Sequence, residues 1–309
     1  MARFRILSLD GGGIRGLITA ILLARLDAEQ GLRAWLEHAD LVAGTSTGGL
    51  IALALARGTS LAEIRALYEE RGRSIFDDSW LDNLKDLGNI IGAQYHTGKL
   101  QAELQRLFGA ARLRDLGKRV LIPTFDLDNE DPRPDQRRWK PKLFHNFPGP
   151  DSDGAALAWK VGLYTSAAPT YFPTVEGFVD GGVFANNPAM CALAQSQDAR
   201  IGRRPALHNV ALLSLGTGSS LLYVKGRKHD WGYAQWSRAL LGVMFDGTIG
   251  IADYQCRQLL GTRYHRLAPR FAPGEAFPLD AIERIPEMVA FAERVDIAPA
   301  AAWLRRNWK

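Results

Sequence analysis

The 309-residue chain has little cysteine and no long apolar run. Its two cysteines, Cys191 and Cys256, are too few for a disulfide framework and lack the close spacing of a zinc or redox motif. We interpret both as reduced thiols and expect a cytoplasmic protein. The longest apolar runs, such as residues 50–56, fall far short of the ~20 residues that cross a bilayer. The first residues also lack the apolar core of a secretory signal, so any membrane association is expected to be peripheral.

A large excess of one charge is also missing. Lysine and arginine number 38 against 33 acidic residues, a formal net charge of +5. This balance favours anionic surfaces but is too small to indicate a nucleic-acid partner, which leaves phospholipid headgroups as candidates. The hydrophobic fraction of 47% and the charged fraction of 23% are those of a globular protein, and they exclude disordered, collagen-like and coiled-coil classes.

Apolar segments of strand length alternate with helical stretches along the chain. This alternation predicts an α/β layered fold with a largely parallel sheet. The expected strands are residues 3–9, 40–43, 119–125, 177–179, 210–215 and 264–267. The expected helices are residues 15–30, 50–57, 60–71, 99–108, 155–164 and 188–200, with further helices after residue 231. Two polar stretches, 72–98 and 126–142, are expected to be covering loops, the first a candidate lid.

A serine lies between two glycines at an expected strand-to-helix junction, in the sequence Gly44-Thr45-Ser46-Thr47-Gly48. This G-x-S-x-G pattern is typical of a nucleophile elbow, in which a tight turn holds the serine in strained backbone geometry. Side chains two residues to either side would collide there, which favours glycine. Ser46 would project freely, with the helix dipole and the Thr47 N–H directed at a developing oxyanion. A flexible glycine loop before a helix is the alternative interpretation.

A glycine-rich turn, DGGGIRG at residues 10–16, follows the first expected strand. Its consecutive N–H groups at a helix N-terminus form a nest that suits a phosphate or an oxyanion. The same letters match the G-x-G-x-x-G dinucleotide fingerprint, so a nucleotide-binding module on Gly11 to Gly16 is the alternative outside enzymes. The Ser46 turn disfavours it, because a Rossmann fold needs an acidic residue at the end of its second strand.

Asp180 follows another expected strand and precedes two glycines, in DGGVFANNP at residues 180–188. Its carboxylate would point to where strand ends gather, the usual ligand crevice of an α/β sheet. An isolated Asp-Gly pair indicates a turn aspartate, but beside a serine elbow and a glycine nest it supplies a base. Nucleophile, base and oxyanion donors together make an acyl-transfer site that requires no metal and no cofactor.

The motifs DGGGIRG, GTSTGG and DGGVFANNP, in that order, resemble those of the patatin-like phospholipases. The segments LIPTFD at 121–126 and TSAAPTYFP at 165–173 are also similar to family sequence, so the resemblance covers residues 3–218. It implies a three-layer α/β/α fold with a mostly parallel central sheet, in a single domain over residues 1–309. Residues 219–309 resemble the family only in being helical.

The resemblance makes Ser46 the nucleophile and Asp180 the proton acceptor. It implies that Arg15 either orients the glycine loop or binds a lipid phosphate. It places the oxyanion hole at Gly11, Gly12 and Gly13. The implied enzyme is a lipid acyl hydrolase that cleaves carboxylic esters of membrane lipids through an acyl-enzyme. The same dyad would also serve an acyltransferase, a thioesterase or a phospholipase that awaits an activator.

A Ser-His-Asp triad is the rival mechanism, since His208, His229 and His265 all follow the acid in chain order. None of the three has motif context. The acidic run Asp126, Asp128, Glu130 and Asp131 lacks the glycine of a calcium loop, and we interpret it as a solvated loop.

Basic residues surround Trp139 between residues 133 and 142, and others accompany two tryptophans at residues 303–309. The first segment is either a contact with an anionic membrane or a plain surface loop. The second is either an interfacial amphipathic end or a helix docked on the domain.

Overall fold

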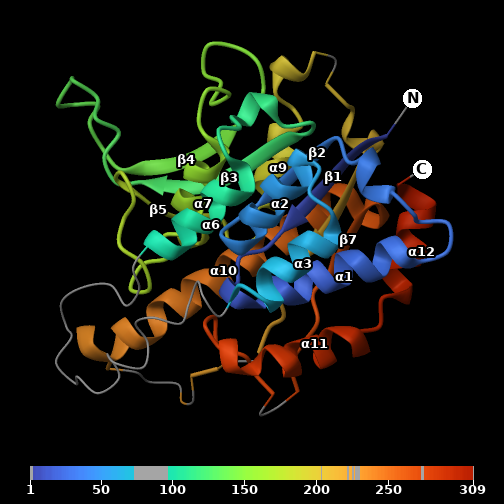
Figure 1. Ribbon diagram of the computed structural model, residues 1–309. Helices are drawn as coiled ribbons and strands as arrows, with labels where there is room; N and C mark the ends of the chain where they lie inside the picture. Colours follow the sequence, from blue (N-terminus) through green and yellow to red (C-terminus); the bar gives the residue numbers. More distant parts are fainter. Residues whose placement is uncertain are drawn as a thin grey trace.

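The computed structural model describes residues 3–72, 97–202, 204–220, 223–224, 226, 230–272 and 275–308. Within these ranges seven strands form one sheet in the order β4-β3-β2-β1-β6-β7, with β5 also paired to β3 (Figure 1). They are β1 (Phe4–Leu9), β2 (Leu41–Gly44), β3 (Arg119–Asp126), β4 (Lys140–His145), β5 (Phe178–Asp180), β6 (Val210–Leu215) and β7 (Tyr264–Leu267). Neighbours from β3 to β7 along this order are parallel, whereas β4 and β5 run antiparallel to β3. The predicted mostly parallel sheet is confirmed.

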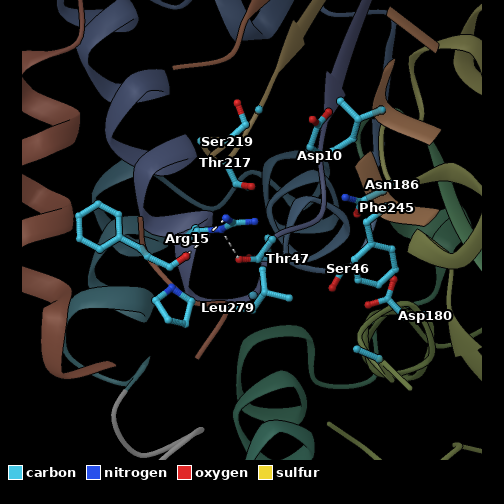
Figure 2. Close-up of a pocket in the computed structure, with 18 of the residues that line it drawn as sticks. Asp10, Arg15, Ser46, Thr47, Asp180, Asn186, Thr217, Ser219, Phe245 and Leu279 are labelled. Atoms are coloured by element: carbon cyan, nitrogen blue, oxygen red, sulfur yellow. Dashed lines mark hydrogen bonds between the residues drawn. The ribbon is translucent and has the colours of Figure 1, made fainter. Parts of the chain in front are cut away.

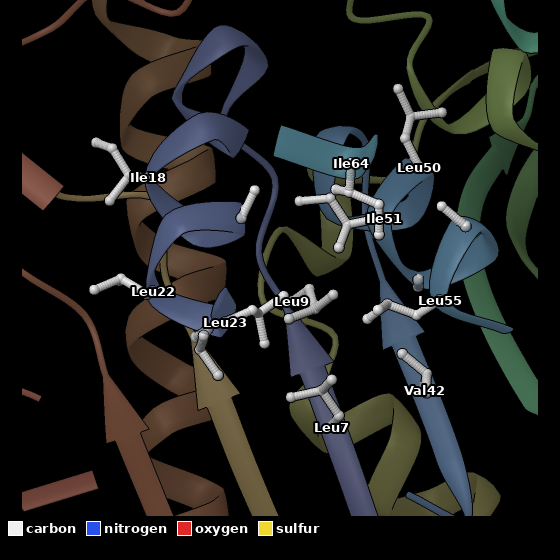
Figure 3. Close-up of a cluster of buried hydrophobic side chains, with 14 of the residues drawn as sticks. Leu7, Leu9, Ile18, Leu22, Leu23, Val42, Leu50, Ile51, Leu55 and Ile64 are labelled. Carbon is white, nitrogen blue, oxygen red and sulfur yellow. The ribbon is translucent and has the colours of Figure 1, made fainter. Parts of the chain in front are cut away.

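Helices cover both faces of this sheet. The helices are α1 (Gly16–Ala28), α2 (Thr47–Arg57), α3 (Leu61–Glu69), α6 (Gly98–Phe108), α7 (Ala158–Thr165), α8 (Gly182–Ala185), α9 (Ala189–Gln195), α10 (Tyr233–Leu260), α11 (Ile285–Arg294) and α12 (Ala298–Asn307). Because side chains alternate along a strand, Leu7 and Leu9 of β1 enter a core with α1 and α2 (Figure 3). Ile6 enters a second core with α9 and the end of α10. The result is the three-layer α/β/α arrangement.

Helix α1 anchors the glycine loop that precedes it. Its sequence, GLITAILLARLDA, is apolar on almost every side, and it packs against α2, α3 and α11 as well as the sheet. A helix that is hydrophobic all round has to be buried. Ile18 and Leu22 are fully buried (Figure 3), and burial of each such side chain contributes about 1.5–3 kcal/mol. This packing fixes the start of α1, and with it the loop at residues 10–15.

Several predicted boundaries differ from the structure. Strand β4 lies within and beyond the stretch expected to be a covering loop, because its polar sequence KPKLFH fits an edge strand with one face in solvent. Helix α9 ends at Gln195 and not near residue 200, where Asp198 instead caps a short 3₁₀ turn. Strand β5 ends on Asp180 itself. Most of the predicted lid, residues 73–96, lies outside the described residues.

The C-terminal tryptophans are docked in the protein. Trp303 donates from Nε1 to the Thr262 carbonyl at 2.8 Å, and Trp308 donates to the Trp35 carbonyl at 2.9 Å. Both indoles are buried. Of the two interpretations of residues 303–309, the docked helix is therefore correct and the interfacial one is wrong. Across the described residues, no helix combines the length and the apolar character needed to traverse a bilayer.

Candidate active site

A cavity of about 720 Å³ lies where the parallel strands end. Its lining includes Gly12 after β1, Ser46 after β2 and Thr217 after β6. Asp180 at the end of β5 and Phe245 of α10 complete this part of the wall (Figure 2). Parallel strands bring their carboxyl ends to one edge, so turns far apart in the sequence meet there. The structure thus gathers the three motifs that the sequence singled out.

Ser46 occupies a strained turn between β2 and α2. Its backbone has φ 54° and ψ −126°, a conformation that a residue with a side chain rarely adopts. A Cβ added at Gly44 would lie 2.0 Å from the Gly48 carbonyl oxygen, and one added at Gly48 would lie 2.3 Å from the Leu9 oxygen. The turn therefore requires glycine on both sides, as the G-x-S-x-G pattern predicted. Such strain costs of order 1–3 kcal/mol and is typical of functional sites.

Thr165, at the end of α7, holds the serine turn in place. Its hydroxyl accepts the Ser46 backbone N–H at 2.9 Å and donates to the Pro123 carbonyl at 2.6 Å. The side chain is fully buried. Sequence reasoning did not assign Thr165 a role, although it opens the segment TSAAPTYFP that was noted as family-like. We regard it as a positioning residue, because it acts on Ser46 through the backbone.

Asp180 is buried directly beside Ser46. Its Oδ1 accepts the Gly182 N–H at 2.7 Å, and the Ser46 hydroxyl lies near enough to act on its pKa. Burial raises the pKa of Asp180 to about 7, although the Gly182 N–H and the Ser46 hydroxyl act to lower it. A carboxylate with this pKa accepts a proton effectively near neutral pH. Figure 2 shows the two side chains facing each other with Phe245 alongside.

The glycine loop is fixed from two sides. Gly11 donates its N–H to the Asn186 carbonyl at 3.0 Å, and its own carbonyl accepts the Thr217 hydroxyl at 3.0 Å. This differs from the expectation that Gly11 is an oxyanion donor, because its N–H is already engaged. Gly12 and Gly13 line the cavity, and among the described residues their N–H groups have no acceptor. Gly13 has φ 58°, which bends the loop at this point.

Arg15 serves the loop in this geometry. Its Nε donates to the Gly12 carbonyl at 3.4 Å and its Nη1 to the Phe277 carbonyl at 3.5 Å (Figure 2). The guanidinium carbon lies 5.9 Å from the centre of the Phe271 ring. Burial lowers the pKa of Arg15 to about 10, so the side chain is still charged at neutral pH. These contacts favour the first of its two predicted roles, orientation of the glycine loop.

A buried ion pair ties the first motif to the C-terminal part of the chain. Arg266 of β7 donates from Nη1 to Asp10 Oδ1 at 2.8 Å and forms a second bond from Nη2 to Oδ2. It also donates to the Ser214 hydroxyl at 2.7 Å. Burial alone would lower the pKa of Arg266, but the Asp10 carboxylate outweighs it and raises that pKa. Asp10 directly precedes the glycine loop, so this pair fixes the loop's first residue.

The remaining candidates lie elsewhere. No described histidine lines the cavity: His265 stacks on Trp303 and His208 is exposed, while His229 is outside the described residues. In the acidic run, Asp128 pairs with Arg137 and Asp131 with Arg133. Over the described residues, three His, Cys, Asp or Glu side chains nowhere come together as a metal site would require.

Comparison with known proteins identifies relatives over most of the chain. The model of the patatin-like phospholipase family matches residues 7–193. A cGAMP-activated phospholipase of Pseudomonas aeruginosa is 31% identical over 91% of this chain and 83% of its own length. Patatin-like protein 1 of Oryza sativa is 29% identical over 95% of this chain and 81% of its own.

These findings confirm the family that the three motifs predicted, and with it the enzyme class of a serine hydrolase acting on lipid esters. The family match ends within α9, so the C-terminal helices that line part of the cavity lie beyond it. By its sequence, this chain belongs to the patatin-like phospholipase family.

Proposed function

We propose that the protein is a lipid acyl hydrolase of the phospholipase A or lipase type, with Ser46 as nucleophile and Asp180 as general base. The observation that supports this most strongly is the position of the Ser46 side chain, which lies at a strained elbow and faces the buried Asp180 carboxylate across the same cavity (Figure 2). A direct Ser-Asp pair needs no intermediary histidine.

In the proposed reaction, Asp180 takes the hydroxyl proton as Ser46 Oγ attacks the ester carbonyl carbon. The tetrahedral intermediate collapses, its bond to the leaving oxygen breaks, and Asp180 returns the proton to the departing lysolipid or alcohol. Water then attacks the acyl-serine ester, again losing its proton to Asp180. The second intermediate collapses, its bond to Ser46 Oγ breaks, and Asp180 returns the proton to Ser46, which releases the fatty acid and restores the free dyad.

The oxyanion of each intermediate is assigned to the N–H groups of Gly12 and Gly13. Both glycines line the cavity, their N–H groups have no acceptor among the described residues, and a preorganised donor of this kind contributes about 3–4 kcal/mol to catalysis. Gly11 and Arg15 hold that loop by the bonds described above. The site as proposed uses neither a metal nor a cofactor.

We infer that residues 1–309 act as one catalytic domain, because the Asp10–Arg266 pair and helix α10 join the C-terminal part to the cavity. The substrate is a membrane lipid ester, so contact with a bilayer is expected. Trp139 is 72% exposed beside basic residues and supports peripheral contact with an anionic membrane. Both cysteines are free thiols, in keeping with the cytoplasmic location that we propose.

A second candidate is an activator-dependent phospholipase. The similarity to a cGAMP-activated phospholipase extends over 91% of this chain, well beyond the catalytic motifs. Under this proposal, lipid hydrolysis would need a cyclic dinucleotide. Assays with and without cGAMP distinguish the two candidates. An equal rate of lipid hydrolysis in both assays would contradict the proposal that the enzyme depends on cGAMP.

The deciding experiment is mass spectrometry of the products released from mixed phospholipid and galactolipid liposomes. Wild type is compared with Ser46→Ala and Asp180→Asn, each with and without cGAMP. Free fatty acid and lysolipid formed by wild type alone would support the dyad and identify the substrate class. Transfer of the acyl group to an added alcohol without net fatty acid would indicate an acyltransferase. Full activity of either variant would overturn the proposed mechanism.

A further inference from the structure

The cavity lining holds carboxylates and arginines beyond those that the proposed reaction uses. Among the described residues, its lining includes four arginines: Arg15, Arg257, Arg266 and Arg270. Arg257 is paired with Asp253 at 3.0 Å, and Arg266 is paired with Asp10. Arg15 is bonded to two backbone carbonyls. Two of these arginines are therefore neutralised by carboxylates of the protein, and the third already donates to backbone carbonyls.

Arg270 differs from the other three. Its residue lines the cavity and is exposed, and no carboxylate or carbonyl of a described residue bonds its guanidinium. An arginine presents five N–H donors in a planar fork that fits a phosphate with two parallel bonds. A fork without a partner at a cavity wall is available to an anionic ligand.

Ser219 adds a hydroxyl at the same place. Residues 219 and 270 form an isolated parallel bridge, with Ser219 N–H donating to the Pro269 carbonyl at 3.1 Å and Phe271 N–H donating to the Ser219 carbonyl at 2.9 Å. Both residues line the cavity, and within the described part of the chain the Ser219 hydroxyl has no partner. A cation and a neutral donor on adjoining segments form the kind of pair that binds phosphate oxygens.

The sheet places this pair at a useful separation from the nucleophile. Ser46 follows β2 and Arg270 follows β7, and the order β2-β1-β6-β7 puts three strand spacings between them. At about 4.8 Å per spacing this is roughly 14 Å along the sheet edge, a span that the long arginine side chain can shorten. Both ends open into one cavity, so a lipid with its ester at Ser46 can direct its headgroup toward Arg270.

We propose that Arg270 and Ser219 form a subsite for the phosphate of a phospholipid headgroup and so favour phospholipids over neutral lipid esters. This inference rests on the proposed lipid hydrolase function and adds the substrate class to it. Arg15 is a poor alternative for this task because its donors already face Gly12 and Phe277. A galactolipid has no phosphate and gains nothing from the subsite.

The test compares two lipids with identical acyl chains in neutral detergent micelles, phosphatidylcholine and monogalactosyl diacylglycerol. Neither has a net charge, so general attraction to the micelle surface is minimal. The variant is Arg270→Gln. The matched control is Arg33→Gln. Arg33 is exposed and precedes β2, so it lies toward the amino ends of the parallel strands, away from the cavity at their carboxyl ends. Arg270→Gln should lower kcat/KM for phosphatidylcholine about tenfold, the effect of one charge-assisted hydrogen bond, and leave the galactolipid within about twofold.

A binding measurement makes the subsite testable without turnover. Glycerol 3-phosphate should raise the Tm of wild type and of Arg33→Gln but not that of Arg270→Gln. Inorganic phosphate in parallel separates recognition of a headgroup from recognition of free phosphate, since a headgroup site should respond more strongly to the glycerol ester. Equal losses on both lipids, no loss on phosphatidylcholine, or an unchanged Tm response in Arg270→Gln would overturn the subsite. A wild type that hydrolyses neither lipid yet binds glycerol 3-phosphate through Arg270 would instead count against the proposed function alone.

Discussion

The buried base should make the protein less stable, and Asp180→Asn should reveal by how much. The pKa of Asp180 is raised from 3.8 to about 7 by burial. Between these two values the folded protein holds a proton that the unfolded chain has lost, so stability falls as pH rises through this window. A shift of about 3 units corresponds to about 4 kcal/mol, the upper limit of the destabilisation above pH 7.

Asparagine has nearly the same shape and does not titrate, and its oxygen can still accept the Gly182 N–H. We therefore expect Asp180→Asn to be more stable than wild type by up to about 4 kcal/mol at pH 8. The difference should shrink as pH falls and vanish near pH 4. At about 2 °C per kcal/mol for a chain of this size, the gain in Tm at pH 8 is about 8 °C.

Thermal unfolding measured from pH 4 to pH 8 tests this expectation, with Asp135→Asn as the same substitution at an exposed position. The same titration governs catalysis, so kcat/KM of wild type should fall as pH drops below about 7. A gain in Tm that is constant with pH, or a loss of stability at pH 8, would refute the reasoning that burial sets this pKa.

Three further predictions concern the parts that hold the site. Gly48→Ala should cost about 1–3 kcal/mol in urea unfolding and abolish activity, since its Cβ meets backbone at 2.3 Å; Gly98→Ala, with nothing within 4 Å, should do neither. Thr165→Val removes the hydroxyl that accepts the Ser46 N–H and should lower kcat about tenfold with little change in KM, whereas Thr165→Ser should retain most activity. Equal kinetics for the two variants would contradict the proposal that Thr165 positions Ser46. Arg266→Met should destabilise by about 3–5 kcal/mol because it leaves Asp10 unpaired, and adding Asp10→Asn should recover part of the loss in a double-mutant cycle.

The chemistry of the site could be predicted because it restricts residue types at fixed spacing. A serine in a strained elbow needs glycine two residues to either side, so the pattern of residues 44–48 identifies Ser46 as a candidate nucleophile from the sequence alone. Central strands such as β1 and β6 are also visible, since burial on both faces demands a mostly apolar sequence. Strand β4 gave no such signal, because an edge strand with one face in solvent has a polar sequence.

Hydrogen bonds between distant segments left no pattern to detect. Thr165 lies 119 residues from Ser46, and Arg266 lies 256 residues from Asp10. Nothing in the local sequence of either partner records the other. The engagement of the Gly11 N–H by Asn186 is of the same kind, which is why three equivalent glycine donors were expected where the structure leaves two.

Substrate selection should for the same reason be harder to predict than catalysis. The dyad and the glycine loop lie on three turns within the family match, but one wall of the cavity comes from α10 and the residues after β7, beyond that match. That wall needs only apolar volume at Phe245 and Ile249, a requirement that many side chains meet. The charged guanidinium of Arg270 makes a stricter demand than these apolar positions, because a bound ligand has to supply the opposite charge. Arg270 is therefore the position at which this otherwise tolerant wall can distinguish one lipid from another.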